Sequence, residues 1–387
     1  MRLSRVQDHG IHRKSSMTIR SAFVLLSALA SMVIPGCTTT TPAGDPESVD
    51  RGLEWLANHQ DENGRWDADG FMKHDTEGKP CDGAGNPVHD VGATGLALLA
   101  FLGKGNTLRS GPHKDVVIDA VKWLRSQQGL NGLFGTNASH DFIYDHAIAT
   151  YAMCEAYGLS DYKTLRKTAQ GGINYLESHR NAHSCWRYQP RDGSSDSSVT
   201  FWCVFAYIAA RDFKLEVNPN ALKIADSYYD QLINPKTGHC GYTKRGETSS
   251  RHPGDHATRY PIAKTETLTA ASMMARLFLG HSRQEPIMQK AADLVAKKPP
   301  IWSKNGDIDH LYWYCGTYAM YQMGGDHWRD WHRALTPAVI ATQRRDDNFN
   351  GSWDPVGVWG EDGGRVYATA LMVLTTEAHF RYTRLIR

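Results

Sequence analysis

One pattern occurs six times along this chain of 387 residues. In each copy an apolar helical segment leads into a turn rich in glycine and aromatic residues, and a second apolar helical segment follows with a threonine near its start. The six threonines are Thr94, Thr150, Thr200, Thr269, Thr317 and Thr369. A repeat of about fifty residues that carries two helices is typical of a helical-hairpin array. The sequence therefore predicts an all-α fold.

The two helices of each unit differ in their apolar pattern. The first has one apolar face, as at Val49, Gly52, Leu53 and Leu56, whereas the second is apolar nearly all round, as at 96–102. Helices with one apolar face border solvent, and helices apolar on every side are buried. We therefore expect an (α/α)6 toroid of six hairpins, with about twelve helices in two concentric layers. An open superhelix is the alternative, but it would expose the inner helices to water.

The first 36 residues have the features of an export signal. Basic residues precede the apolar run 22–34, which is too short for a permanent membrane span. The run leads into Gly36-Cys37, which resembles a bacterial lipoprotein processing site, although Pro35 is unusual there. We predict a signal peptide over 1–36, a lipidated Cys37 that begins a tether over 37–45, and one toroid domain over 46–387. Ordinary signal cleavage nearby is the alternative.

The net charge and the motifs of the chain limit the kinds of partner and cofactor that we expect. Residues 1–36 hold five basic residues and one acidic residue, so their removal changes the net charge from +2 to −2. A nucleic-acid partner is therefore not expected, and the predicted partner is the membrane of a periplasmic or cell-surface location. The sequence has no CxxC pair, P-loop or dinucleotide glycine motif. We expect no cofactor and no metal, and we regard the His252/His256 spacing as weak.

The connections inside each hairpin point to one working face. Those over 61–89, 234–264 and 344–364 are about 29, 31 and 20 residues long. Loops longer than about 12–15 residues in a compact domain are usually functional. All of them lie where the inner helices begin, and six helix N-termini there favour negative charge. We expect the ligand at this face, and an anionic group in it rather than a cationic one.

The first unit resembles a known repeat. Residues 52–56 (Gly-Leu-Glu-Trp-Leu), Gln60 and Gly64-Arg65-Trp66 are similar to the Gln/Trp repeat of the squalene–hopene cyclase and protein prenyltransferase superfamily. Weaker copies combine Trp123-Leu124, Gln127 or Gln128 and 132–134, or Gln343 and 351–353. The resemblance implies a double-layered helical toroid with a central cavity, in agreement with the layering above.

The catalytic signatures of that superfamily are missing. Its cyclases carry Asp at four, two and one residues before the repeated threonine, and here Asp90 and Asp196 match only the first of these positions. Its prenyltransferases bind zinc through an Asp-x-Cys pair, whereas the comparable stretch here, 313–315, reads Trp-Tyr-Cys. The fold is therefore implied by the resemblance and the activity is not.

Polar and aromatic residues near the inner-helix starts are the candidates for function. We expect acid–base roles for Asp90, His146, Asp196 and Glu266, and ligand contacts from His89, Tyr260, Trp313, Tyr314 and Arg365. Carboxylates and imidazoles meeting at the cavity mouth suit general acid–base chemistry, and aromatics suit isoprenoid chains or sugar rings. The alternatives are structural: Asp90 and Asp196 can cap helices, and Arg365 can pair with Glu361 or Asp362.

Two classes of function fit these observations. The first is an exported, lipid-anchored protein that holds an apolar or isoprenoid-type ligand in its cavity, without classical cyclase or prenyltransferase activity. The second is a glycan-active lyase or hydrolase with acid–base residues at the toroid mouth. The sequence does not decide between binder and enzyme.

Overall fold

The protein is a ring of helices. The computed structural model describes residues 46–381, so the predicted signal peptide, Cys37 and the tether lie outside the described residues. Within that range the chain forms thirteen α-helices, α8 being a short turn. The outer layer is α1 (Pro46–Asn58), α3 (Lys114–Ser126), α5 (Arg166–His179), α7 (Pro219–Leu232), α10 (Pro286–Ala296) and α12 (Gly325–Val339). The inner layer is α2 (Asp90–Gly103), α4 (Phe142–Ser160), α6 (Ser197–Asp212), α9 (Thr267–Leu279), α11 (His310–Met323) and α13 (Gly360–Arg381).

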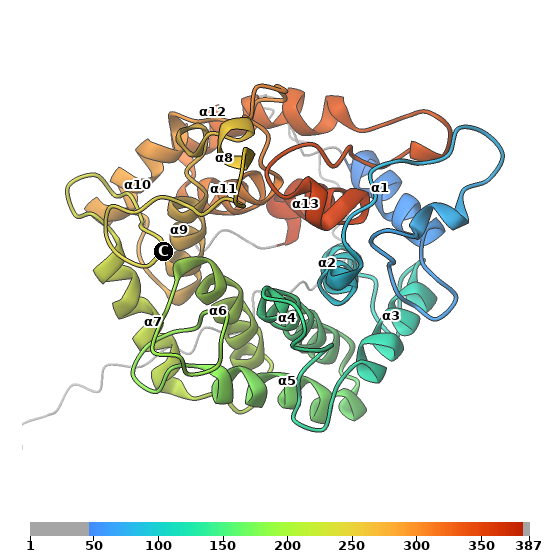
Figure 1. Ribbon diagram of the computed structural model, residues 1–387, viewed down its shortest axis with the longest axis horizontal. Helices are drawn as coiled ribbons and strands as arrows, with labels where there is room; N and C mark the ends of the chain where they lie inside the picture. The colour runs from blue at the N-terminus through green and yellow to red at the C-terminus, as the bar shows by residue number, and fades with distance from the viewer. Residues whose placement is uncertain (1–45, 382–387) are drawn as a thin grey trace, which may run out of the picture.

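The ring is closed. Each inner helix packs against the next, and α13 packs against α2, so the inner layer has no free end. Figure 1 shows the two layers, with α1 of the first unit beside α13 of the last. The predicted all-α toroid of six hairpins in two concentric layers is confirmed, and the open superhelix is excluded. No described helix is both long enough and apolar enough to cross a bilayer.

In four of the six units the repeated threonine joins the inner helix to its own turn. All six threonine side chains are fully buried. The hydroxyl of Thr94 accepts a hydrogen bond from the Trp66 N–H at 3.0 Å, and that of Thr369 accepts one from the Trp353 N–H at 3.2 Å. Thr200 and Thr269 bind the turns before them in the same way. The threonine is therefore the residue that pairs a buried turn N–H, which would be costly to leave unpaired.

The glutamine of the repeat joins neighbouring units. The Gln60 amide donates to the carbonyls of Gly64 in its own turn and Val116 in the next outer helix, at 3.0 and 3.1 Å. Gln128 bridges Gly132 and Thr168 in the same manner. A backbone carbonyl in the first turn of an outer helix already accepts a hydrogen bond within that helix. The glutamine amide therefore donates to the second lone pair of the same oxygen. Each bridge fixes the spacing of two consecutive hairpins.

The glycine of the turn lets the units approach closely. Gly64 has a φ of +95°, and a Cβ at this position would lie 2.1 Å from the carbonyl oxygen of Asp119 on α3. Gly132 and Gly351 have φ values of +92° and +99° and meet the backbone of the next outer helix in the same way. Only glycine satisfies both the positive φ and the contact.

Long connections cover one end of the ring. They run from outer to inner helices, and that between α7 and α9 includes α8 (His256–Arg259). The connections from inner to outer helices are short, as between α4 and α5. The inner helices begin at the covered end, where the loops form the mouth of the toroid.

Candidate functional site

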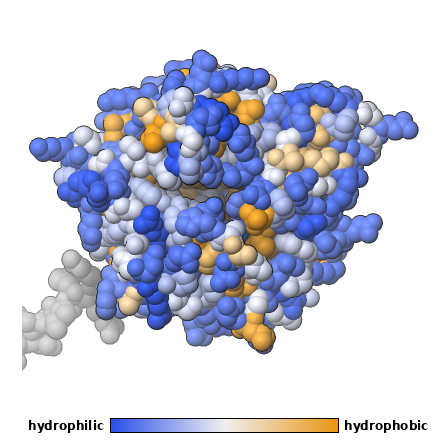
Figure 2. Space-filling view, in the orientation of Figure 1, coloured by the Kyte–Doolittle hydropathy of each residue, from blue (hydrophilic) through white to orange (hydrophobic). Residues whose placement is uncertain are grey.

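A cavity of about 450 Å³ lies inside the ring at the end where the inner helices begin. All six inner helices contribute to its wall, together with the loop 249–253 and residues just before α4. Figure 2 shows the hollow near the middle of the face that Figure 1 presents, within a mostly hydrophilic surface. The predicted face therefore contains a cavity of the size that small ligands occupy.

The position two residues before the repeated threonine faces this cavity in every unit. These six residues are Gly92, Ile148, Ser198, Thr267, Cys315 and Tyr367, and all of them line the cavity. Two residues turn an α-helix by about 200°, which places this position opposite the threonine that binds the outer layer. None of the six is a carboxylic acid, so the position at which cyclases of the superfamily with the similar Gln/Trp repeat carry an aspartate has no acid in this chain.

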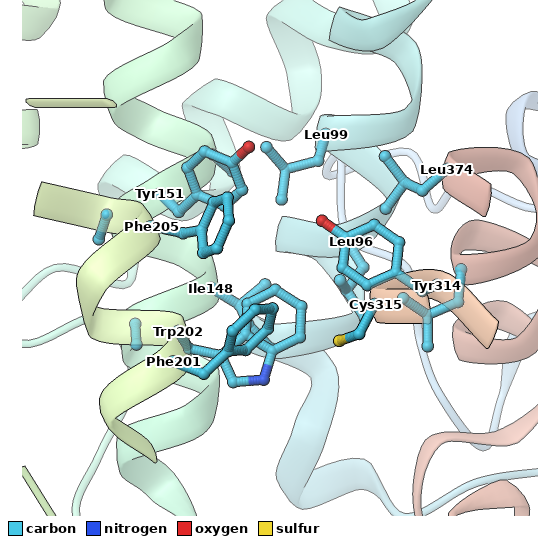
Figure 3. Close-up of a cluster of buried hydrophobic side chains, with 14 of the residues drawn as sticks. Leu96, Leu99, Ile148, Tyr151, Phe201, Trp202, Phe205, Tyr314, Cys315 and Leu374 are labelled. Carbon is cyan, nitrogen blue, oxygen red and sulfur yellow. The ribbon is translucent and has the colours of Figure 1, made fainter. Parts of the chain in front are cut away.

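The deep wall of the cavity is apolar. Leu96, Ile148, Phe201, Trp202, Leu268 and Cys315 line it. Figure 3 shows the buried side chains at the centre of the ring, where Trp202 and Tyr314 come from opposite sides, and their rings stack with centroids 6.1 Å apart. Tyr151, Phe205, Leu99 and Leu374 lie in the same cluster. An apolar interior of this kind binds hydrocarbon surface without a desolvation penalty for polar groups.

A histidine–aspartate pair stands at the rim. His89 Nδ1 lies 3.1 Å from Asp145 Oδ2, and both side chains are largely buried. Burial lowers the pKa of His89, but the hydrogen bond and charge of Asp145 outweigh it and raise the pKa above its usual value. Burial raises the pKa of Asp145, and His89 opposes that rise. Because both pKa values rise, the pair retains a proton to higher pH than an isolated histidine would.

The absence of a side chain at Gly92 leaves space for the Asp145 carboxylate of the His89–Asp145 pair. A Cβ at Gly92 would lie 2.2 Å from Asp145 Oδ1, so a larger residue here would displace the carboxylate. Asp141 and His140 line the cavity nearby. The rim next to α2 and α4 is therefore acidic and can hold or move a proton.

The loop 249–253 closes the opposite side of the rim. His252 Nε2 lies 2.8 Å from Asp362 Oδ2, and the His252 ring packs edge-on against Trp359. Arg251 also lines the cavity, and its guanidinium donates to the carbonyls of Tyr260 and Ser250 at 3.0 and 2.9 Å. Among residues 46–381 Arg251 forms no ion pair, so it is a half-buried cation facing the cavity with neutral partners.

Of the nine predicted site residues, His89 is the one in the wall of this cavity. Asp90 turns the other way and binds the Ala68 N–H at 2.9 Å and Arg65 at 2.8 Å. Asp196 caps α6 by accepting from the N–H groups of Ser198 and Val199, as the structural alternative held. Burial raises the pKa of both carboxyls to about 6 against these favourable contacts.

His146 and Glu266 lie in the junctions between the layers. His146 Nδ1 accepts from the Phe134 N–H at 3.0 Å, its Nε2 faces the Gly172 carbonyl at 3.2 Å, and burial lowers its pKa to about 3. Glu266 binds Lys298 at 2.7 Å and His239 at 3.0 Å. Burial would raise the pKa of Glu266, but these two partners lower it to about 2. Neither side chain belongs to the cavity wall.

Arg365 requires a correction. The sequence suggested a ligand anion, or a pair with Glu361 or Asp362, but the structure pairs Arg365 with Asp354 at 2.9 Å and with Asp82. Its guanidinium also lies over the Phe349 ring at 4.6 Å, and the side chain is fully buried. Arg365 therefore fastens the 59–89 loop to the last unit, away from the cavity.

The three aromatic residues predicted to contact a ligand lie in three different places. Trp313 is fully buried against Trp302 and His310, outside the cavity wall. Tyr314 lies in the central cluster beside Trp202. Tyr260 packs against His256 at the end of α8. Both ring nitrogens of His256 face protein groups, the His252 N–H and the Val358 carbonyl, which accounts for this histidine without a metal.

Comparisons with known proteins agree with the fold. No family model matches this chain, and no curated protein matches it in sequence. Among solved structures it is similar to the α-1,6-mannanase GH76A of Salegentibacter sp. HEL1_6, at a TM-score of 0.57 and 12% identity over 86% of this chain and 98% of that chain. It is also similar to an α-amylase from Clostridium perfringens, at a TM-score of 0.55 and 11% identity over 86% and 97%. For the type II terpene cyclase MstE from Scytonema the TM-score is 0.53 and the identity 14%, over 86% and 96%.

These likenesses show the toroidal fold. They include a terpene cyclase, in line with the predicted superfamily, but glycan-active enzymes match at least as well. A specific relation to squalene–hopene cyclases is therefore not shown. Fold alone does not assign an activity, and the function has to be argued from the cavity.

Proposed function

We propose that this protein binds an apolar, isoprenoid-type ligand in the central cavity, with the polar end of the ligand at the rim. The supporting observation is the division of the wall: the deep part is built from Leu96, Phe201, Trp202 and Leu268, and the charged groups stand at the mouth. Burying hydrocarbon against such a wall contributes about 25 cal/mol per Å² of apolar surface. The cavity volume of about 450 Å³ suits a molecule of a few isoprene units.

The rim supports a polar or anionic end group. Arg251 faces the cavity with carbonyl and hydroxyl partners, so an anion there gains a charge-assisted hydrogen bond. The His89–Asp145 pair can donate a proton to, or accept one from, a group beside it. Squalene-type cyclisation is not proposed, because none of the six positions two residues before the threonines is an acid.

Mass spectrometry under native conditions tests the proposal. A bound lipid should co-purify with the protein, and Ala271→Trp should remove it, because Ala271 on α9 lines the cavity and a tryptophan fills it. The matched control is Ala341→Trp at an exposed position of the outer layer, which should retain the ligand. A ligand retained equally by both variants, with both folded, would place the binding site elsewhere.

A glycan-active enzyme is the second candidate. Three carboxylates, Asp141, Asp145 and Asp362, line the same rim beside Trp359 and Tyr188, and paired carboxylates with aromatic platforms suit glycoside chemistry. A panel of polysaccharides distinguishes the two candidates. Release of reducing ends that is lost in Asp145→Asn would support the enzyme, and an inactive protein with a co-purifying lipid would support the binder.

Export and lipid anchoring complete the proposal. A lipidated Cys37 would hold the toroid next to a membrane, which is a source of apolar ligands. The protein would then be a periplasmic or cell-surface lipoprotein whose mouth receives molecules from that membrane.

A further inference from the structure

A second cluster of chemically active side chains lies outside the cavity wall, at the seam where the first unit meets the last. It consists of His59 just after α1 and of Asp75 and Cys81 in the long loop that follows. The imidazole nitrogen, a carboxylate oxygen and the thiol sulfur all lie within 4.8 Å of one another. The side chains of His59 and Asp75 are 5% and 7% exposed, and Cys81 is 6% exposed.

The hydrogen bonds of His59 orient it as a metal ligand. Its Nδ1 lies 2.7 Å from the Trp55 carbonyl, which only accepts, so Nδ1 carries the proton. The lone pair of Nε2 then points at Asp75 Oδ1, 3.2 Å away. Two acceptors that face each other at this distance need a proton or a cation between them. A backbone carbonyl that holds one ring nitrogen while the other binds a metal is the usual arrangement in metalloproteins.

Hydrogen bonds also hold the other two candidate ligands, Asp75 and Cys81. Asp75 Oδ2 accepts the Cys81 N–H at 2.6 Å, so the carboxylate and the thiol are fixed to each other. The Cys81 thiol donates to the carbonyl oxygen of Asn348 at 3.2 Å, and this oxygen also accepts from the Trp55 indole at 2.8 Å. The last unit thus places a carbonyl oxygen beside the Cys81 sulfur. The His59 ring is stacked on Trp55 with centroids 4.1 Å apart, which limits its rotation.

From this geometry we propose that His59, Asp75 and Cys81 form a structural zinc site at the seam of the ring. Thiolate and imidazole ligands with one carboxylate favour Zn²⁺ over Ca²⁺ or Mg²⁺, which prefer oxygen ligands alone. One thiolate and one carboxylate balance the charge of Zn²⁺, so a buried site of this composition is neutral overall. The site differs from the prenyltransferase-type pair, whose position would fall at 313–315 on an inner helix.

The bound ion would fix the start of the 59–89 loop. From Cys81 the chain continues to Asp82, which binds Arg365, and then to His89 at the cavity rim. Zinc would therefore fasten α1, this loop and the Asn348 carbonyl to one another at the point where the ring closes. The proposal does not depend on the identity of the cavity ligand.

Cobalt substitution and metal analysis of the purified, mature-length protein test the site. We expect one Zn²⁺ per chain after incubation with zinc and dialysis, and a thiolate-to-cobalt charge-transfer band in the near ultraviolet when Co²⁺ replaces it. Cys81→Ser should abolish that band and weaken zinc binding at least about tenfold. The matched control is Cys154→Ser, another buried thiol, on α4, which should leave band and stoichiometry unchanged.

A second variant tests the site if Cys81→Ser does not fold. Asp75→Asn keeps the shape of the side chain and should also weaken zinc binding, and zinc should raise the melting temperature of the wild type more than that of this variant. X-ray absorption at the zinc edge of the wild type should show one sulfur ligand with nitrogen and oxygen neighbours. Absence of bound zinc in the wild type, or a zinc environment without sulfur, would overturn the proposal.

Discussion

The side-chain amide of Gln343 donates a hydrogen bond to the carbonyl of Ser48 at 2.9 Å, across 295 residues of sequence. The same nitrogen donates to the Gly351 carbonyl at 2.8 Å, and the Gln343 carbonyl oxygen accepts from the Ser48 hydroxyl at 2.9 Å. Gln343 therefore does at the seam what Gln60 and Gln128 do between consecutive units. The repeat closes on itself because its last copy binds its first.

Gln343→Ala should destabilise the fold by about 1–3 kcal/mol, because it leaves buried partners on Ser48 and Gly351 unpaired. Urea unfolding followed by circular dichroism measures the loss. Gln127→Ala is the control, since the Gln127 side-chain amide donates to the exposed Ser126 hydroxyl, and its cost should stay below about 0.5 kcal/mol. Equal midpoints for the two variants would show that the seam bond contributes nothing.

Arg365→Ala should lower stability by about 2–4 kcal/mol, through the lost pairs with Asp82 and Asp354 and the space left over Phe349. Ligand binding by the folded fraction should be unchanged, because Arg365 is outside the cavity wall. Arg259→Ala removes an exposed pair with Glu361 and should lower stability far less than Arg365→Ala does. Weakened ligand binding at an unchanged melting temperature would return Arg365 to the site.

The fold could be predicted from the sequence because its determinants repeat. Thr94, Gln60 and Gly64 each have equivalents in other units, and their contacts connect one unit to the next or a turn to its helix. The apolar pattern then separated the layers. Repetition of this kind carries information about architecture, and it says little about the cavity, where the six units differ.

Most of the predicted site residues on the inner helices lie outside the cavity wall. Asp90, His146, Asp196 and Arg365 all stand four residues before a repeated threonine, and four residues return to nearly the same face of a helix. That face is turned toward the outer layer. The inner helices are apolar all round, so polarity alone did not reveal which side faces the cavity.

The sequence carried a usable signal for Asp145, which was missed. Asp145 stands five residues before Thr150, as the predicted His89 stands five residues before Thr94, and both line the cavity. Had the threonine first been assigned to the outer side, the opposite positions would have indicated the wall. Arg251 and Asp362 could not be found in this way, because they come from loops or a kinked helix start whose path depends on tertiary contacts.

Lipid anchoring remains a prediction about residues outside the described range. Wild-type protein expressed in a lipoprotein-processing bacterium should partition into detergent, because a lipid chain adds a large apolar surface. Cys37→Ser should stay in the aqueous phase, and Cys154→Ser, which changes a buried thiol of the toroid, should partition like the wild type. Equal partitioning of all three proteins would argue against an anchor at Cys37.

The Glu266 carboxylate should make stability depend on acid pH. Its pKa is lowered from 4.5 to about 2 in the folded protein, where Lys298 and His239 outweigh burial. A depressed folded-state pKa gives stability that is fully present above about 4.5 and is lost as the pH falls toward about 2, of order 3 kcal/mol in total. Urea titrations at several pH values should show Glu266→Gln less stable than the wild type near neutrality, with the difference shrinking in acid. A constant difference across this range would contradict the assignment.

Asp145→Asn should lower the pKa of His89, because it removes the carboxylate that offsets burial. Histidine NMR signals recorded against pH measure the change, and the spectrum of His89→Gln identifies the signal that belongs to His89. Asp141→Asn is the graded control, since Asp141 raises the pKa of His89 less than Asp145 does.

Because the folded-state pKa of His89 is raised above 6.5, the stability that this pair contributes is full below that pH and is lost as the pH rises through the folded-state value. Asp145→Asn should abolish this dependence, and an unchanged His89 titration in the variant would show that the rim pair does not hold the proton.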